Sequence, residues 1–165
     1  MWRTPDGKVQ HLMCFLSIPD LLGITLTLSF FGTENSSQPC DIGSSLTTLP
    51  AEFPQVDFSQ VDPVFPNKRG NAYANSRPAI VARGQSVLKD LYGRKEKVII
   101  VVSHSGFLRV GVTGKWFYNG DYRVFEFEQG GTKLREFDMT KGKGGLGLSF
   151  EEEVELGDGL PEEEE

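Results

Sequence analysis

The residues of this chain that are best suited to chemistry stand together in Ser103–Gly106 (SHSG). They follow the apolar run Val98–Val102 (VIIVV), and a helical pattern begins after them. Ligands of open α/β sheets bind beyond the carboxyl ends of strands, and a helix start at that place offers free backbone N–H groups and a positive dipole end to an anion. The small residues let a phosphate approach the backbone, and His104 is placed to donate to it or to accept a phosphoryl group. The spacing leaves open the alternative of a histidine in an ordinary strand-to-helix turn.

Other groupings of reactive residues are weak. The two cysteines, Cys14 and Cys40, are too few for a disulfide scaffold or a four-cysteine zinc site, and no histidine stands at a ligand spacing from them. The segment Gly142–Gly147 (GKGGLG) contains glycine and lysine, but it follows no predicted strand and lacks the Walker order, so we interpret it as a linker. These residues indicate no metal site.

One helix and one strand are predicted most clearly, and they set the expected fold class. Ser76 suits a helix N-cap, Pro78 suits the first turn, and Gly93 suits the C-terminal stop. The β-branched run Val98–Val102 is typical of a strand buried on both faces of a parallel sheet. A helix, a short loop and a buried strand are half of a βαβ unit. We therefore expect an α/β fold with a mostly parallel sheet and helices on both faces.

Three further segments have the pattern of strands. Tyr122–Glu128 alternates polar and apolar residues, and Lys133–Phe137 can pair with it as a hairpin. Ile24–Phe31 is short and rich in Ile, Thr and Phe, which predicts a buried strand. Residues 32–75 contain five prolines, which forbid long helices, but also apolar anchors. This region is predicted to be an irregular, packed excursion.

Composition divides the chain into a nearly neutral body and an acidic end. The 165 residues suit one domain and carry a net charge of −6, yet residues 151–165 hold nine carboxylates and no Lys or Arg. Residues 1–150 therefore carry 17 basic and 14 acidic side chains, a balance of +3 without a basic stripe. That charge pattern speaks against a nucleic-acid partner. Residues 141–165, rich in glycine and then in glutamate, are predicted to be a disordered tail.

Targeting signals are not evident. The apolar run Leu21–Phe31 has eleven residues, whereas a bilayer span needs about 20. It begins late, follows Asp20 and is threaded with Thr and Ser, unlike the clean apolar region of a signal peptide. We therefore expect a cytoplasmic protein without membrane association.

The segment Val98–Arg109 (VIIVVSHSGFLR) resembles the second histidine motif of the histidine phosphatase superfamily, in its phosphoglycerate mutase-like branch. Asn119–Phe127 resembles the strand that follows the helix of that motif, and Glu34–Ser45 and Phe53–Pro63 resemble the long insert of fungal members. The resemblance spans residues 33–128. It implies a phosphoglycerate mutase-like fold in residues 33–140 and phosphoryl transfer or phosphomonoester hydrolysis through a phosphohistidine. The implied ligand is a small phosphorylated metabolite or inorganic phosphate, with no metal or nucleotide cofactor.

The resemblance also implies roles for individual residues. His104 resembles the second pocket histidine, which binds the phosphoryl group and stabilises charge that develops on it. Glu34 falls where the family keeps the acid/base carboxylate that protonates the leaving oxygen, although a solvated loop carboxylate is the alternative. Backbone groups at Ser105 and Gly106 would hold phosphate oxygens. Arg109 lies more than one turn into the predicted helix, so we expect it to point to the surface.

The sequence departs from the family pattern in residues 1–32. The family nucleophile is a histidine in an Arg-His-Gly motif on the first strand, and this sequence contains no Arg-His-Gly. The other histidine, His11, stands in Gln-His-Leu, and Lys8 is the only cation between Arg3 and Lys68. Phosphohistidine chemistry needs both a nucleophile and a cationic clamp. We therefore predict a phosphoglycerate mutase-like fold that is incomplete in its N-terminal part, and a very poor phosphatase.

Two alternatives to the enzyme stay open: a non-catalytic remnant that retains an anion pocket or a partner surface, and an α/β domain without phosphate chemistry. In the family, the strand with the nucleophile neighbours the strand that ends in the second histidine. Without that neighbour, Val98–Val102 would be an exposed apolar edge that favours self-association. Leu21–Phe31 has the length and composition to serve as a substitute strand.

Overall fold

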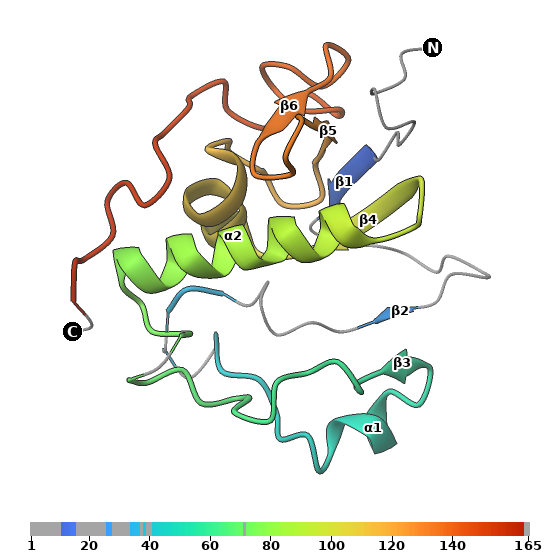
Figure 1. The fold of residues 1–165 in the computed structure, drawn as a ribbon, viewed down its shortest axis with the longest axis vertical. Helices are drawn as coiled ribbons and strands as arrows, with labels where there is room; N and C mark the ends of the chain where they lie inside the picture. Colours follow the sequence, from blue (N-terminus) through green and yellow to red (C-terminus); the bar gives the residue numbers. More distant parts are fainter. Residues whose placement is uncertain are drawn as a thin grey trace.

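A computed structural model describes residues 11–15, 26–27, 34–36, 38, 41–70 and 72–163. The long helix α2 (Arg77–Gly93) crosses the middle of the molecule, with a four-stranded sheet on one side and an irregular region, built mainly from residues 41–70, on the other (Figure 1). In the described part of the chain, no helix is both long and apolar enough to cross a bilayer.

The sheet has the strand order β4-β1-β5-β6. Strand β1 (His11–Phe15) is parallel to β4 (Val98–Val102) and antiparallel to β5 (Tyr122–Phe127), which pairs antiparallel with β6 (Leu134–Glu136). This arrangement is compatible with the α/β class. The described sheet is mixed, however, and not mostly parallel, because the short β5–β6 connection can join only antiparallel neighbours.

The hydrophobic core lies between the sheet and the helices on one of its faces. Helix α2 packs with α3 (Ser105–Phe107) and the π-helix η3 (Leu108–Thr113) against β4 and β5, through apolar residues that include Ile80, Leu88, Phe107, Leu108, Phe125 and Phe127. At the ends of β4, by contrast, Val98 and Val102 are 52% and 50% exposed. The predicted burial of this strand on both faces is therefore wrong, and the described residues show helices on one face only.

Helices α2 and η3 touch backbone to backbone. A Cβ atom on Gly84 of α2 would lie 1.7 Å from the carbonyl oxygen of Gly111 in η3. No rotamer change relieves a clash with backbone, so this close packing requires glycine at position 84.

Several predicted elements are confirmed. Helix α2 begins directly after Ser76 and ends at Gly93, β4 has the predicted bounds, and the β5–β6 hairpin lies within the predicted segments. The prediction for Ile24–Phe31 is met only by β2 (Leu26–Thr27), which pairs with β3 (Val56–Asp57) in a separate sheet, and the rest of that segment lies outside the described residues. The neighbour of β4 is therefore β1 and not the suggested substitute Leu21–Phe31.

The irregular region contains little regular structure, as its prolines predict. It holds the short helix α1 (Leu49–Glu52), β3 and a small apolar cluster around Val61 and Tyr73. Leu46, Phe58, Val64 and Phe65 pack against that cluster. Four of the apolar anchors expected from the sequence, Phe58, Val61, Val64 and Phe65, thus belong to a second, minor core below α2, whereas Phe53 is exposed.

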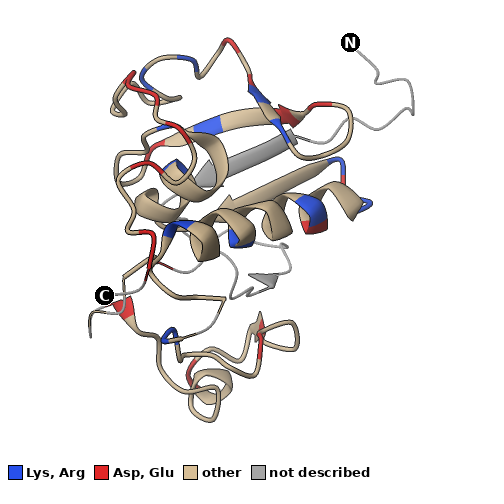
Figure 2. Ribbon diagram, turned by 60° about the vertical axis from the view of Figure 1, so that its left-hand side comes forward, with Lys and Arg blue, Asp and Glu red and all other residues tan. Residues whose placement is uncertain are grey.

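The C-terminal segment differs from the disordered tail that its composition predicts. The main chain of residues 154–161 bonds to helix ends: Val154 N to Gly114 O at 2.9 Å, Gly157 N to Val110 O at 2.7 Å, and Arg77 N to Pro161 O at 2.7 Å. Acidic and basic residues are intermixed on the loops and on the outer side of α2 (Figure 2). Backbone pairing, which a charge count does not register, fixes this segment.

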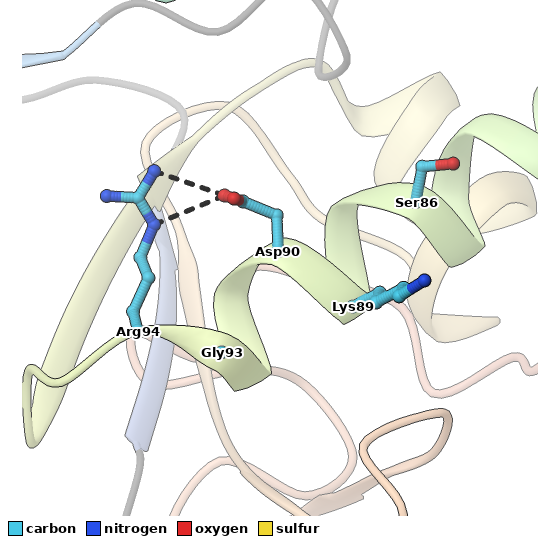
Figure 3. A pocket seen from close by; sticks show the side chains of 5 residues that line it. All are labelled: Ser86, Lys89, Asp90, Gly93 and Arg94. Atoms are coloured by element: carbon cyan, nitrogen blue, oxygen red, sulfur yellow. Dashed lines mark hydrogen bonds and ion pairs between the residues drawn. The ribbon is translucent and has the colours of Figure 1, made fainter.

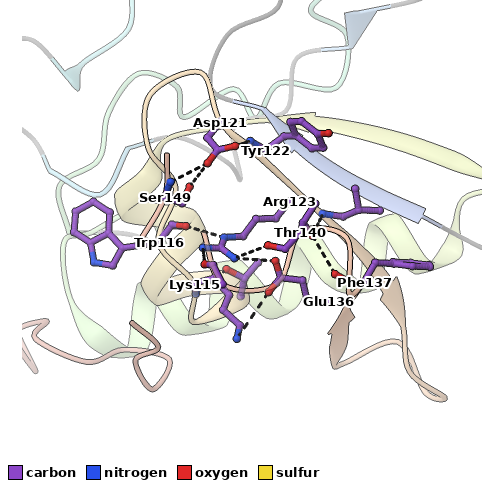
Figure 4. Close-up of polar contacts among 12 residues, drawn as sticks. Lys115, Trp116, Asp121, Tyr122, Arg123, Glu136, Phe137, Thr140 and Ser149 are labelled. Atoms are coloured by element: carbon purple, nitrogen blue, oxygen red, sulfur yellow. Dashed lines mark hydrogen bonds and ion pairs between the residues drawn. The ribbon is translucent and has the colours of Figure 1, made fainter. Parts of the chain in front are cut away.

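Two buried charges hold the glycine-rich segment that precedes it (Figure 4). The Asp121 carboxylate, fully buried, accepts hydrogen bonds from the N–H groups of Tyr122, Leu146, Leu148 and Ser149 and from the Ser149 hydroxyl. Arg123, 1% exposed, pairs with Glu136 at 2.8 Å and donates to the Gly142 and Phe150 carbonyls. The segment predicted to be a linker is therefore an ordered part of the domain.

Candidate functional site

His104 stands at the junction of β4 and the helix formed by α3 and η3. The residue occupies the N-cap position with extended backbone (φ −89°, ψ 142°), and its side chain is 55% exposed. The strand-to-helix junction predicted for Ser103–Gly106 is therefore present. The first turn of this helix directs its free N–H groups toward the same end of the sheet as the carboxyl end of β4.

Glu34 lies next to His104, although 70 positions separate them in the sequence. Its Oε2 atom is 3.4 Å from His104 Nδ1, and its Oε1 atom accepts a hydrogen bond of 2.7 Å from the Asn35 N–H. The Glu34 side chain is 23% exposed, so it is shielded from water more than the imidazole is. A carboxylate and an imidazole that meet at a helix start can together exchange protons with a bound anion.

Gly106 allows this approach. A Cβ atom at position 106 would lie 2.8 Å from Glu34 Oε1 and 3.6 Å from Asn35 Nδ2. Any larger residue would therefore push the carboxylate away from the start of the helix. Gly106 acts on the site through its lack of a side chain.

Ser105 contributes only its backbone. Its hydroxyl donates a hydrogen bond of 2.8 Å to the Phe117 carbonyl, which ties the helix start to the following loop. Arg109 packs its guanidinium over the Trp116 ring, 4.8 Å from the ring centre. It is half-buried there, whereas the sequence predicts a surface position.

Lys68 holds the segment that carries Glu34, and sequence analysis did not identify it. The lysine is 3% exposed, and its ammonium donates to three main-chain carbonyls: Glu34 at 2.9 Å, Ser36 at 2.9 Å and Asp41 at 2.6 Å. Burial lowers the pKa of Lys68, and the nearby Arg83 guanidinium lowers it further. No local pattern marks this lysine, because its three acceptors are about 27 to 34 positions away in the chain.

Arg83 is the second buried cation beside this segment. It is 3% exposed, its Nη2 atom donates to Asn35 Oδ1 at 3.1 Å, and its guanidinium lies 4.6 Å from the centre of the Phe107 ring. Burial lowers the pKa of Arg83 to about 10, while Tyr73 and Glu34 act in the opposite direction. A sequence signal did exist, since Arg83 lies three residues after Ile80 on the apolar face of the predicted helix.

The other histidine is placed at the wrong end of the sheet to join His104. His11 opens β1 opposite Val98, and Phe15 closes it opposite Val102. The two strands are parallel, so about 13 Å of strand separates His11 from the end of β4 that leads to His104.

Two further observations concern the rest of the surface. A shallow pocket at the C-terminal end of α2 is lined by Ser86, Lys89, Asp90, Gly93 and Arg94, and the Asp90–Arg94 ion pair spans it (Figure 3). It contains neither Glu34 nor His104. Among the described residues, no three His, Cys, Asp or Glu side chains gather as metal ligands do. Cys40 lies outside the described residues.

Known proteins similar to this chain are phosphoglycerate mutase-like. One relative, the "Phosphoglycerate mutase-like protein" of Arabidopsis thaliana, is 36% identical over 93 residues, which are 56% of this chain and 33% of that protein. The "Phosphoglycerate mutase-like protein 1" of the same plant is 37% identical over 70 residues, 42% of this chain and 25% of that protein. The chain thus spans a third or less of the curated relatives it matches. No family model and no solved structure matches significantly. The two similarities support the superfamily that the sequence resembles.

Proposed function

We infer that this chain carries the phosphate-binding half of a phosphoglycerate mutase-like active site. In this proposal His104 and the N–H groups at Ser105 and Gly106 bind the phosphoryl group of a small phosphorylated metabolite or inorganic phosphate. Glu34 is the acid/base carboxylate that protonates the leaving oxygen. The observation that carries the proposal is the 3.4 Å approach of Glu34 Oε2 to His104 Nδ1 at the start of a helix that follows a strand.

The proposed chemistry of the intact family is phosphoryl transfer or phosphomonoester hydrolysis through a phosphohistidine. By the resemblance, the described sheet would correspond to part of a phosphoglycerate mutase-like sheet with helices on both faces, and the similarity to two proteins named phosphoglycerate mutase-like supports the family on which this rests. The fungal-type branch and the cytoplasmic location stay predictions.

A non-catalytic form of the same site is the second candidate, and the position of His11 favours it. The only other histidine of the chain lies at the opposite end of the β1–β4 pair, and no Arg-His-Gly motif supplies a nucleophile. A histidine side chain and free backbone N–H groups suffice to bind an anion, whereas phosphoryl transfer also requires an attacking group in line. In this form the chain binds phosphate and does not turn it over.

Thermal unfolding with inorganic phosphate tests binding, and hydrolysis of p-nitrophenyl phosphate tests turnover. We expect millimolar phosphate to raise the melting temperature of the wild type above that in chloride of equal ionic strength, because a ligand of the folded state stabilises it. His104→Ala should lose this rise, and the exposed-site variant Lys89→Met should keep it. No rise in the wild type would contradict the proposed site. Turnover at rates usual for phosphatases, lost in His104→Ala, would contradict the non-catalytic form.

A further inference from the structure

The three residues 34–36 are held between two buried cations that come from different parts of the chain. Lys68 lies near the end of the irregular region, and Arg83 lies on the inner face of α2. Each is 3% exposed. Residues 34–36 contain no regular secondary structure of their own, so their course depends on these external contacts.

Lys68 fixes the main chain of this segment. An ammonium group has three N–H donors, and all three of the Lys68 donors find carbonyl oxygens, at positions 34, 36 and 41. The three carbonyls must therefore converge on one nitrogen atom. That convergence sets the direction in which the Glu34 side chain leaves the backbone.

Arg83 fixes the side of the segment that faces the helix start. Its hydrogen bond holds the amide of Asn35, and its guanidinium packs on the ring of Phe107, the residue after Gly106. Asn35 Nδ2 in turn lies close to Gly106, on the same side as the Glu34 carboxylate. Arg83 thus joins residues 34–36 to the first turn that bears the backbone donors of the site.

Packing alone does not explain two neighbouring buried cations. Burying a charge is costly, and replacement by an apolar side chain of similar size is often neutral or stabilising. Two nitrogen atoms of Arg83, Nε and Nη1, are also left without an acceptor among the described residues. What these cations supply, and an apolar residue does not, is a set of directed hydrogen bonds to the segment that carries Glu34.

We propose that Lys68 and Arg83 are positioning residues that hold the Glu34 carboxylate against His104. The inference rests on the proposed function, since it assigns to both cations a task in the same site. Neither residue touches the ligand. They act through the Glu34 main chain and through Asn35, and without them the carboxylate loses its fixed direction toward the imidazole.

The test measures the contact between Glu34 and His104 by NMR, at one fixed pH and without phosphate. The ring ¹H–¹³C signal of His104, assigned with His104→Gln, is recorded with and without Glu34→Gln in three backgrounds: wild type, Lys68→Met and Arg69→Met. Arg69 is the exposed neighbour of Lys68 and serves as the matched control. We expect Glu34→Gln to shift the ring signal in the wild type and in Arg69→Met, and to shift it less than half as much in Lys68→Met.

A second background, Asn35→Ala, removes the amide held by Arg83 and leaves Lys68 intact. It should also reduce the shift caused by Glu34→Gln by at least half. A shift equal to that of the wild type in Lys68→Met, or in Asn35→Ala if Lys68→Met does not fold, overturns the inference. Because no phosphate is present, the NMR shift does not depend on whether the site binds phosphate. A chain that passes this test but ignores phosphate would refute the proposed function and not the positioning role.

Discussion

Glu34 Oε2 lies 3.4 Å from His104 Nδ1, and the imidazole stands on the N-cap of the helix that follows β4. One partner comes from an irregular segment and the other from a strand end, so neither is near the other in the sequence. The contact places an imidazole at a helix start beside a carboxylate that can exchange protons with a bound anion.

Gly106→Ala should weaken phosphate binding. Its Cβ atom would lie 2.8 Å from Glu34 Oε1, so the carboxylate must move off the helix start. The methyl group also narrows the approach of phosphate to the backbone N–H groups of the first turn, so we expect a several-fold increase in the dissociation constant for inorganic phosphate, measured by calorimetric titration. Gly93→Ala is the control, because no atom lies within 4 Å of its Cβ position. Equal affinities in the two variants would contradict a phosphate site at the first turn of this helix.

Gly84→Ala should destabilise the fold without touching the site. The added methyl group would lie 1.7 Å from the Gly111 carbonyl oxygen, and the contact between α2 and η3 must open to accept it. Overpacking of this kind costs about 1–3 kcal/mol. Urea unfolding of Gly84→Ala and of Gly93→Ala, on the same helix, measures the cost. A free energy of unfolding that is the same in both variants would contradict the close helix contact.

Asp121→Asn should remove a part of the acid sensitivity of folding. Burial opposes ionisation of Asp121, but hydrogen bonds from Ser149, Leu146 and Tyr122 outweigh it and hold the pKa below its ordinary value of 3.8. The unfolded chain therefore binds the proton more readily, and the stabilisation present above about pH 4 is lost as the pH falls through the folded pKa.

We expect Asp121→Asn to be less stable than the wild type by about 2 kcal/mol at pH 7, and the gap to narrow at pH 3. Denaturant unfolding at the two pH values measures it. The exposed variant Asp158→Asn should stay within about 0.5 kcal/mol of the wild type at pH 7. A gap between wild type and Asp121→Asn that is equal at both pH values would contradict the ionised, hydrogen-bonded carboxylate.

The edge strand β4 should promote self-association. It is the outermost strand of the described sheet, contains no charged residue, and exposes Val98 and Val102 at its ends. Such edges template pairing with another chain. Sedimentation velocity should show association that rises with concentration in the wild type and falls in Val102→Lys. Met139→Lys, at another exposed apolar residue, should associate like the wild type. A wild type that stays monomeric throughout the concentration range would contradict this prediction.

Local signals in the sequence were sufficient to predict α2, β4 and the β5–β6 hairpin. Each carries its own cap, turn or periodicity, and these act over a few residues. The mixed sheet was not predicted, because the position of β1 between β4 and β5 follows from long-range pairing that the segment His11–Phe15 does not itself encode in a pattern.

The candidate site was likewise predicted only in part. The family resemblance identified His104 in Val98–Arg109 and Glu34 in the separate segment Glu34–Ser45, but not the buried cations Lys68 and Arg83. Lys68 donates to main-chain carbonyls, which every residue type has. The identity of its acceptor residues therefore gives no sequence signal. Asp121 and Arg123 also bind the backbone of residues 142–150. For that reason the glycine content of this segment led to the wrong prediction of a linker.

Phosphate titration followed by NMR tests the central claim most directly, because the chain has two histidines and one experiment reports on both. The ring signal of His104 should move with inorganic phosphate and saturate in the millimolar range, and Glu34→Gln should change that response. The signal of His11, at the far end of the β1–β4 pair, should stay in place. A His104 signal that ignores phosphate, or that moves in step with His11, would contradict the site.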